Sequence, residues 1–199
     1  MILRFICGNI FIGISIDPLL PVFEGACMNH GMKGRTKKIA MLGLYTALAM
    51  ILGYIEILFP VGGLLGGIPG IKLGLANLVI LFVLDTFSAP EAALVSVVRI
   101  LLIDTLFGRV SSIPIAMGGA FLSLLVMSFL KHKTKAGTCA VSIAGGIAHN
   151  VGQVLVVLVW LKVWGYVYYA PVLVIAGMIT GFVIGVLVSE AEKRLGEDM

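Results

Sequence analysis

Long apolar runs separated by short polar segments constrain this chain more than any other feature of its sequence. Of the 199 residues, 60% are hydrophobic and only 12% are charged, whereas a soluble domain carries roughly 25% charged residues. The mean hydropathy is +1.12. Because so few charged side chains cannot cover a surface that faces water, the solvent is expected to be a lipid bilayer. We therefore predict an all-α, polytopic membrane protein, and we exclude a nucleic-acid binder, a disordered tail and a collagen-like rod.

Prolines, glycines and basic residues divide the apolar region into six predicted transmembrane helices. Pro60 ends the first, and Pro90 with Glu91 is typical of the start of the third, because proline and an acid are favoured in a first helical turn. The six expected spans are residues 39–59, 72–87, 90–107, 113–130, 139–161 and 171–189. They predict one six-helix membrane domain over residues 37–190, followed by a cytoplasmic tail at 191–199.

Residues 1–36 are expected to be an N-terminal extension outside this domain. Their apolar run from Phe5 to Ile16 is too short to cross about 30 Å of hydrocarbon. One interpretation is a signal peptide, against which stand the single basic residue and the lack of a small-residue cleavage site after the run. The other is a translation start at Met28 or Met32, which the basic segment after Met32 favours.

Lysine and arginine predict that both chain ends lie in the cytoplasm (N-in/C-in), because cytoplasmic connections are enriched in these residues. With the N-terminus inside, the inner ends carry Lys33, Arg35, Lys37, Lys38, Lys131, Lys133, Lys135, Lys193 and Arg194. The outer ends carry Lys72, Arg109 and Lys162. An outer interfacial belt is expected from the aromatic cluster Trp160, Trp164, Tyr166, Tyr168 and Tyr169. The expected location is the inner (plasma) membrane of a bacterial cell, crossed several times.

Small residues predict where the helices pack, because close backbone contact holds helices together in lipid. The last span has glycine at every fourth position, in a stripe expected to serve helix packing: Gly177, Gly181 and Gly185. The first span has two small faces, one with Gly43 and Ala47 and one with Ala49 and Gly53. We expect one face to pack inside the protein and the face of Gly43 and Ala47 to dock a partner.

Polar residues at membrane depth predict a cavity. An ionisable group near the bilayer centre costs roughly 2.5–3.5 kcal/mol and so needs a partner, water or a ligand. At about 1.5 Å per residue, Asp104 lies about 5–6 Å, Arg99 about 13 Å and His149 about 17–19 Å below the outer end of their helices. A polar cavity that opens outward follows. The residues expected to bind a substrate in it are Lys72, Asn77, Arg99, Asp104, His149, Asn150 and Gln153.

Internal pairing is the alternative interpretation of these residues. His149 and Gln153 are one helical turn apart with Asn150 beside them, so the three also fit an interhelical hydrogen-bond cluster. Arg99 also fits a structural ion pair between helices. Two acids at an inner connection are expected to be solvated, namely Asp85 and Glu91.

Signatures of catalysis and of metal binding are missing from the sequence. The glycine-rich segment 61–70 lacks the spacing and the following Ser or Thr of a P-loop, and there is no HExxH motif or nucleophile elbow. Magnesium–diphosphate chemistry uses clustered carboxylates, and the four aspartates lie far apart in the sequence. Cys7, Cys27 and Cys139 form no metal or redox motif. We expect no catalytic residue, no metal ion and no cofactor.

Two segments resemble the Gx transporter family, which is also catalogued as heptaprenyl diphosphate synthase component I. They are Pro69–Asn77 (PGIKLGLAN) and Ala144–Gln153 (AGGIAHNVGQ), and Lys38–Ala40 and Arg99 add to the resemblance over about residues 36–190. The resemblance implies a relation to the S components of energy-coupling-factor transporters. Those six-helix proteins bind a nutrient from outside and dock a transmembrane coupling subunit, which works with two ATPases, through small residues on the first helix.

Three functions follow as hypotheses. The leading one is a substrate-binding membrane subunit for uptake of a small nutrient, with residues 61–70 as a lid. The family's second name implies an alternative, a non-catalytic membrane component of heptaprenyl or polyprenyl diphosphate synthesis with a soluble prenyltransferase as partner. A structural subunit of a larger membrane complex is the third. Membrane lipid and a small-molecule ligand are the other expected partners, and nucleic acid is not one.

Overall fold

The computed structural model describes residues 34–58, 74–134 and 136–197, which are helical apart from short connections. The helices in this part are α3 (Gly34–Leu58), α5 (Leu75–Thr86), α6 (Ala89–Leu106), η1 (Val110–Ser112), α7 (Ile113–Lys133), α8 (Thr138–Trp160), η2 (Trp164–Tyr169) and α9 (Ala170–Glu197). The elements η1 and η2 are short 3-10 helices that lead into α7 and α9. The predicted all-α fold is confirmed for the described residues.

Among residues 34–58, 74–134 and 136–197, four helical segments are long and apolar enough to cross a membrane: Gly34–Leu58, Val110–Lys133, Thr138–Trp160 and Trp164–Glu190. The helix α6 has 18 residues but contains three charged side chains. The helix α5 has 12 residues and so measures only about 18 Å. It begins later than the predicted span 72–87, whose first residues lie outside the described part of the chain. The structure therefore supports a polytopic membrane protein with four long spans.

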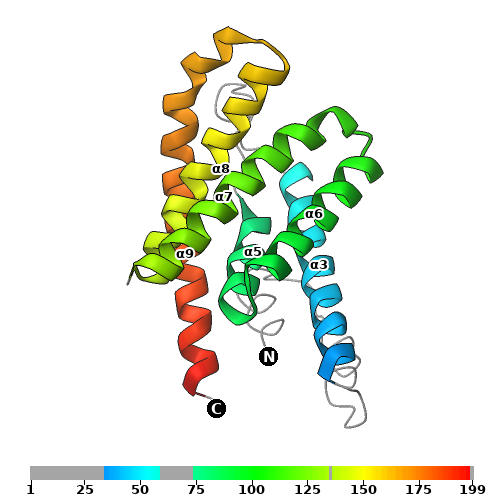
Figure 1. The fold of residues 1–199 in the computed structure, drawn as a ribbon, viewed down its shortest axis with the longest axis vertical. Helices are drawn as coiled ribbons and strands as arrows, with labels where there is room; N and C mark the ends of the chain where they lie inside the picture. The colour runs from blue at the N-terminus through cyan, green and yellow to red at the C-terminus, as the bar shows by residue number, and fades with distance from the viewer. Residues whose placement is uncertain (1–33, 59–73, 135, 198–199) are drawn as a thin grey trace.

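The helices form two groups around α5 (Figure 1). On one side α8 packs along both α7 and α9, and on the other side α3 packs against α5 and α6. Large apolar side chains such as Phe121, Phe129 and Val159 are exposed on the outside, as expected of a surface that faces lipid.

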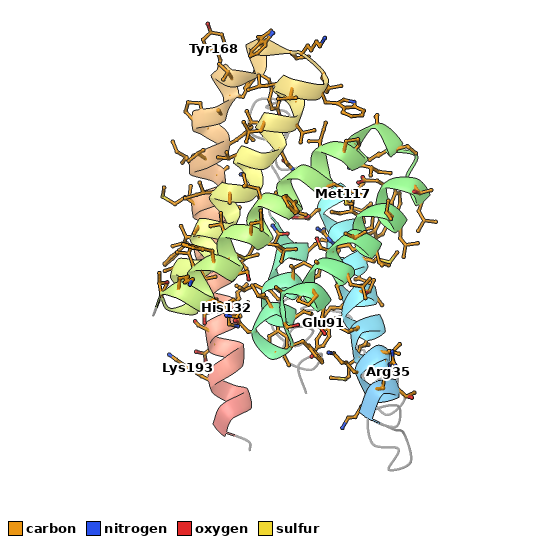
Figure 2. All side chains as sticks on the ribbon, viewed as in Figure 1. Arg35, Glu91, Met117, His132, Tyr168 and Lys193 are labelled. Carbon is orange, nitrogen blue, oxygen red and sulfur yellow. The ribbon has the colours of Figure 1, made fainter. Side chains whose placement is uncertain are left out.

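The two ends of the bundle differ in how many lysine and arginine residues they carry. One end, called here the basic end, carries Arg35, Lys37, Lys38, Lys131, His132, Lys133 and Lys193; all are exposed (Figure 2). The connections from α6 to α7 and from α8 to α9 lie at the opposite end, where Tyr168 is 84% exposed.

The helix α5 lies in the core because it is apolar on every side. Residues 78–84 are all buried, and they join Leu52 of α3 and Val95 of α6 in the main hydrophobic cluster. Gly74, which precedes α5, has a φ of 71°. Few side chains tolerate this left-handed conformation, so glycine is favoured where the chain turns into α5.

Close backbone contact joins α8 to α9. A Cβ atom on Gly177 would lie 2.6 Å from the carbonyl oxygen of Gly146, and one on Gly185 would lie 2.7 Å from the Cα of Cys139. Between them, a Cβ on Gly181 would lie 2.8 Å from the Ser142 carbonyl oxygen. Any side chain at these three positions would therefore push the two helices apart.

The two small faces of α3 have different surroundings. Ala49 and Gly53 are buried, and a Cβ atom on Gly53 would lie 2.6 Å from the Cδ1 of Ile103 in α6. Gly43 and Ala47 are exposed, and a Cβ atom on Gly43 would have no neighbour within 4 Å. One small face thus packs inside the protein, as predicted, while the other remains open.

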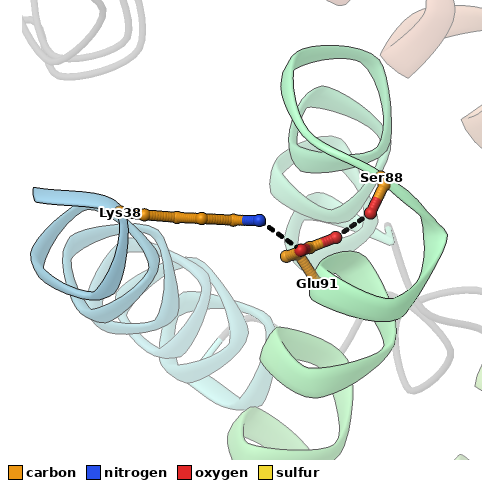
Figure 3. A network of polar contacts seen from close by, with 3 residues as sticks. All are labelled: Lys38, Ser88 and Glu91. Atoms are coloured by element: carbon orange, nitrogen blue, oxygen red, sulfur yellow. Dashed lines mark hydrogen bonds and ion pairs between the residues drawn. The ribbon is translucent and has the colours of Figure 1, made fainter. Parts of the chain in front are cut away.

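The expectation that Asp85 and Glu91 are solvated holds only in part, because their side chains are 15% and 18% exposed and each forms an ion pair with a lysine. Lys38 of α3 pairs with Glu91 of α6, which also accepts a hydrogen bond from Ser88 (Figure 3). Lys131 of α7 pairs with Asp85 at the end of α5. The length of α7 explains the second ion pair. This helix continues to Lys133, through residues that the sequence indicated as a basic loop, and it thereby brings Lys131 to Asp85.

The polar tail is helical for most of its length. The sequence predicted that the last helix ends at 189, whereas α9 continues to Glu197. Residues 190–197 are Glu, Ala, Lys, Arg and Leu apart from one glycine, and these five types have good helix propensity. They follow a helix that is already formed, so extension adds one hydrogen bond per residue without a new nucleation step.

Candidate functional site

A cavity of about 100 Å³ lies in the centre of the bundle, and each of the six α-helices in the described part of the chain contributes to its wall. Its volume is well above the roughly 10–15 Å³ that one water molecule needs. Five residues that the sequence assigned to a substrate site line it together: Asn77, Arg99, Asp104, His149 and Asn150. The pattern of polar residues on separate helices therefore does converge in space.

Arg99 is one of two arginines in the described part of the cavity wall, the other being Arg109. Its Nε atom is buried and has no hydrogen-bond partner within the described residues. Neither ion pair in this part of the chain involves Arg99. The carboxylates whose charges act on it, those of Glu56 and Asp104, influence it through space.

Both of these carboxylates are held by other groups. Oε1 of Glu56 accepts a hydrogen bond of 2.8 Å from the backbone N–H of Leu75, the first residue of α5. A carboxylate is favoured there because the N-terminus of a helix carries a partial positive charge. Oδ1 of Asp104 accepts a hydrogen bond of 2.8 Å from the Ser112 hydroxyl in η1. The two acids thus tie α3 to α5 and α6 to η1.

The three polar residues of α8 play different structural parts. Asn150 Nδ2 donates a hydrogen bond of 2.6 Å to the carbonyl oxygen of Leu173 in α9. Gln153 Nε2 and His149 Nε2 are 3.0 Å apart. Gln153 is only 5% exposed and lies against Gly119 of α7. A Cβ atom built on Gly119 would come 2.8 Å from the Cγ atom of Gln153.

The interhelical interpretation is confirmed for Asn150, and the ligand-binding interpretation stays a prediction. Asn150 links two helices and also lines the cavity. His149 lines the cavity, while Gln153 lies behind it and holds its ring. Lys72 and the segment 61–70, assigned to substrate binding and to a lid, lie outside the described residues.

Five polar residues of the wall were not assigned to the site from the sequence: Glu56, Arg109, Ser123, Ser142 and Thr180. Glu56 could have been assigned to the site from the sequence, since an acid in an apolar helix needs a partner. No sequence signal marks the three hydroxyl residues as part of the cavity wall, because Ser and Thr can bond to the carbonyl oxygens of their own helix. Ser123 instead donates 2.9 Å across to the carbonyl oxygen of Gly145 in α8.

The arrangement suits hydrogen bonding to a small polar ligand. Arg99, Asn77 and Asn150 bring donors to the cavity, and Glu56 and Asp104 bring acceptors. Within the described residues, no group of three or more His, Cys, Asp or Glu side chains is placed to hold a metal ion.

A family model matches most of this chain. The family model for heptaprenyl diphosphate synthase component I matches residues 45–191, which include the whole polar lining described above. No curated protein and no solved structure matched the chain. The match spans well over half of the 199 residues and agrees with the resemblance carried by Pro69–Asn77 and Ala144–Gln153. The chain belongs to the heptaprenyl diphosphate synthase component I family.

Proposed function

We propose that this protein is the membrane component of heptaprenyl or polyprenyl diphosphate synthesis, that it binds a small polar ligand in the central cavity, and that a soluble prenyltransferase performs the transfer. The observation that carries the proposal is the family match over residues 45–191, because the matched region contains the cavity as well as the helices that build it.

A non-catalytic role is supported by the state of the acids in the cavity. Diphosphate chemistry with Mg²⁺ uses carboxylates that are free to ligate the metal together. Glu56 and Asp104 instead bind Leu75 and Ser112, and their charges act on Arg99. The cavity residues are thus suited to hold a ligand rather than to carry out prenyl transfer.

We further propose that the protein resides in a bacterial plasma membrane with its basic end in the cytoplasm, so that α3, α5, α6, α7, α8 and α9 form six crossings or partial crossings. The distribution of charge supports this orientation. Arg35, Lys37, Lys133 and Lys193 lie at the basic end, whereas Arg109 and Lys162 lie at the opposite end. A soluble synthase would then meet the basic end.

Co-purification tests the main proposal. The tagged full-length protein, extracted from its own cells in mild detergent, should retain a prenyl diphosphate synthase that a tagged membrane protein of similar size does not retain. Deletion of the gene should also change the chain length or the amount of polyprenyl diphosphate product. Retention of no synthase together with an unchanged product profile would rule the proposal out.

Uptake of a nutrient is the second candidate, and the exposed face of α3 favours it. Gly43 and Ala47 leave this face open for close packing by another helix, as a coupling subunit with its ATPases would require. Replacement of Ala47 by Trp should then abolish co-purification of a coupling subunit while leaving the thermal stability of the isolated protein unchanged. If the wild-type protein retains no such subunit, uptake by this route is excluded.

A further inference from the structure

We infer that the central cavity recognises an oxyanion, a phosphate, diphosphate or carboxylate group of the ligand, through Arg99. The inference rests on the proposed role of the cavity as a ligand site and names the chemical class of that ligand. The Arg99 side chain carries it, and a backbone element, the start of α5, lies beside the same cavity.

The side chain is that of Arg99. A guanidinium presents five N–H donors in a fixed fork that matches an oxyanion. Arg99 lines the cavity, its Nε is buried without a partner, and no hydrogen bond or ion pair in the described part of the chain uses its donors. Arg99 as a whole is only partly buried, so its other guanidinium donors remain for an oxyanion in the cavity.

The backbone element is the start of α5. Gly74, Ala76 and Asn77 line the same cavity as Arg99, so the first turn of this 12-residue helix faces the ligand space. The first turn of a helix carries a partial positive charge that favours anions. Part of it is already used here, because Glu56 accepts the N–H of Leu75 and the N–H of Asn77 donates to the carbonyl oxygen of Gly74. Arg99 therefore carries the inference, and the start of α5 only adds to it.

The two nearby acids provide a further test of the inference, because their negative charges oppose the binding of an anion. Glu56 and Asp104 are close enough for their charges to act on Arg99, and both line the cavity. Their charges would repel a bound anion. Removal of either charge should therefore strengthen anion binding, whereas a purely structural Arg99 that neutralises these acids gives no such gain.

The test uses the purified full-length protein in detergent and isothermal titration calorimetry. The probes are inorganic pyrophosphate, farnesyl diphosphate and succinate, which separate a free phosphate, a prenyl diphosphate and a carboxylate as the source of the oxyanion. We expect at least one probe to bind. Arg99→Gln should weaken it at least tenfold, and Arg99→Lys several-fold because the fork is lost. Glu56→Gln and Asp104→Asn should each tighten it several-fold.

The matched control is Lys133→Gln, which removes one positive charge at the basic end and should leave affinity unchanged. If Arg99→Gln fails to fold, Arg99→Lys and Asp104→Asn still give opposite expected shifts. No binding of any probe by the wild type, or equal affinity of the wild type and both Arg99 variants, overturns the inference. Co-purification with a synthase does not require anion binding by the isolated chain, so retention of the synthase without probe binding overturns only the inference.

Discussion

At Gly177, the difference between a hydrogen atom and a methyl group decides how closely α8 and α9 approach. The carbonyl oxygen of Gly146 and the Nδ2 atom of Asn150 would lie 2.6 Å and 2.7 Å from a Cβ atom there. The same Asn150 amide donates to the carbonyl oxygen of Leu173. The glycine thus permits both the close backbone contact and the polar link between these helices.

Gly177→Ala should therefore destabilise the protein by about 1–3 kcal/mol, the usual cost of forcing an extra carbon into a packed interior. Thermal unfolding of the purified protein in detergent measures this as a fall in Tm. Gly43→Ala is the matched control, because a Cβ atom there meets nothing within 4 Å and alanine favours a helix more than glycine does. A Gly177→Ala variant that melts with the wild type would contradict the tight packing of α8 on α9.

Single residues also show which parts of the site a sequence can reveal. Arg99, Asp104 and His149 stand out because ionisable groups are rare in apolar helices, and all three line the cavity. Ser142 and Thr180 also line it, but a hydroxyl in a helix carries no sign of which way it faces. Gln153 looked like a cavity residue, and only the packing of α7 on α8 places it behind His149.

At the scale of elements, α5 is held at both ends by charged side chains from neighbouring helices. Glu56 of α3 accepts the N–H of Leu75 at its start. Lys131 of α7 donates to the carbonyl oxygen of Leu84, 3.1 Å away, and pairs with Asp85 at its end. An acid at the N-terminus and a cation at the C-terminus both complement the helix dipole, so a short helix is stabilised without depending on its own length.

Lys131→Met should lower stability by about 1–2 kcal/mol, the upper part of the range for a charge at a partly buried helix end. It would also leave the Asp85 carboxylate, whose Oδ2 is already buried without a partner in the described part, with no counter-charge. Lys133→Met is the control at the same helix end. The double variant Asp85→Asn with Lys131→Met should recover part of the loss, and denaturant unfolding in detergent measures all four proteins. Equal losses from both lysine variants would refute the role of Lys131.

The lengths of elements were only partly predictable, for a physical reason. Apolar composition locates α6, α7 and α8 to within a few residues, since polar or helix-breaking residues flank them. Composition does not reveal that α7 continues to Lys133. Lysine is a good helix former but is also common in loops, and the extension of α7 depends on the contact of Lys131 with Asp85 of α5. The acids at 85 and 91 were misjudged for the same reason, since their partners come from other helices.

At the scale of the whole molecule, composition predicts the class of fold but not the arrangement of the helices. A chain with 12% charged residues has to fold in lipid, and only helices or closed barrels satisfy the backbone there. The placement of α5 between α3, α6 and α9 depends on side-chain packing that no periodicity reports. The cavity follows from that placement.

The orientation of the whole molecule can be measured by thiol labelling. Single cysteines at Lys133 and at Lys162, introduced into a variant in which Cys7, Cys27 and Cys139 are replaced, lie at opposite ends of the bundle. With the basic end in the cytoplasm, a membrane-impermeant maleimide should label Lys162→Cys and spare Lys133→Cys in intact cells. Permeabilised cells are the control, in which both sites react. Labelling of Lys133→Cys alone in intact cells would reverse the proposed orientation.

The length of α9 has a consequence for anything attached to it. Its 28 residues measure about 42 Å, some 12 Å more than the roughly 30 Å thickness of the hydrocarbon layer. Its last turns extend beyond the ends of α7 and α8, to about the level at which α3 begins (Figure 1), and glycine contacts anchor the helix to α8. A fluorophore fused behind Glu197 would thus stand at a fixed height above the lipid headgroups and report tilting of α9 as a change in that height.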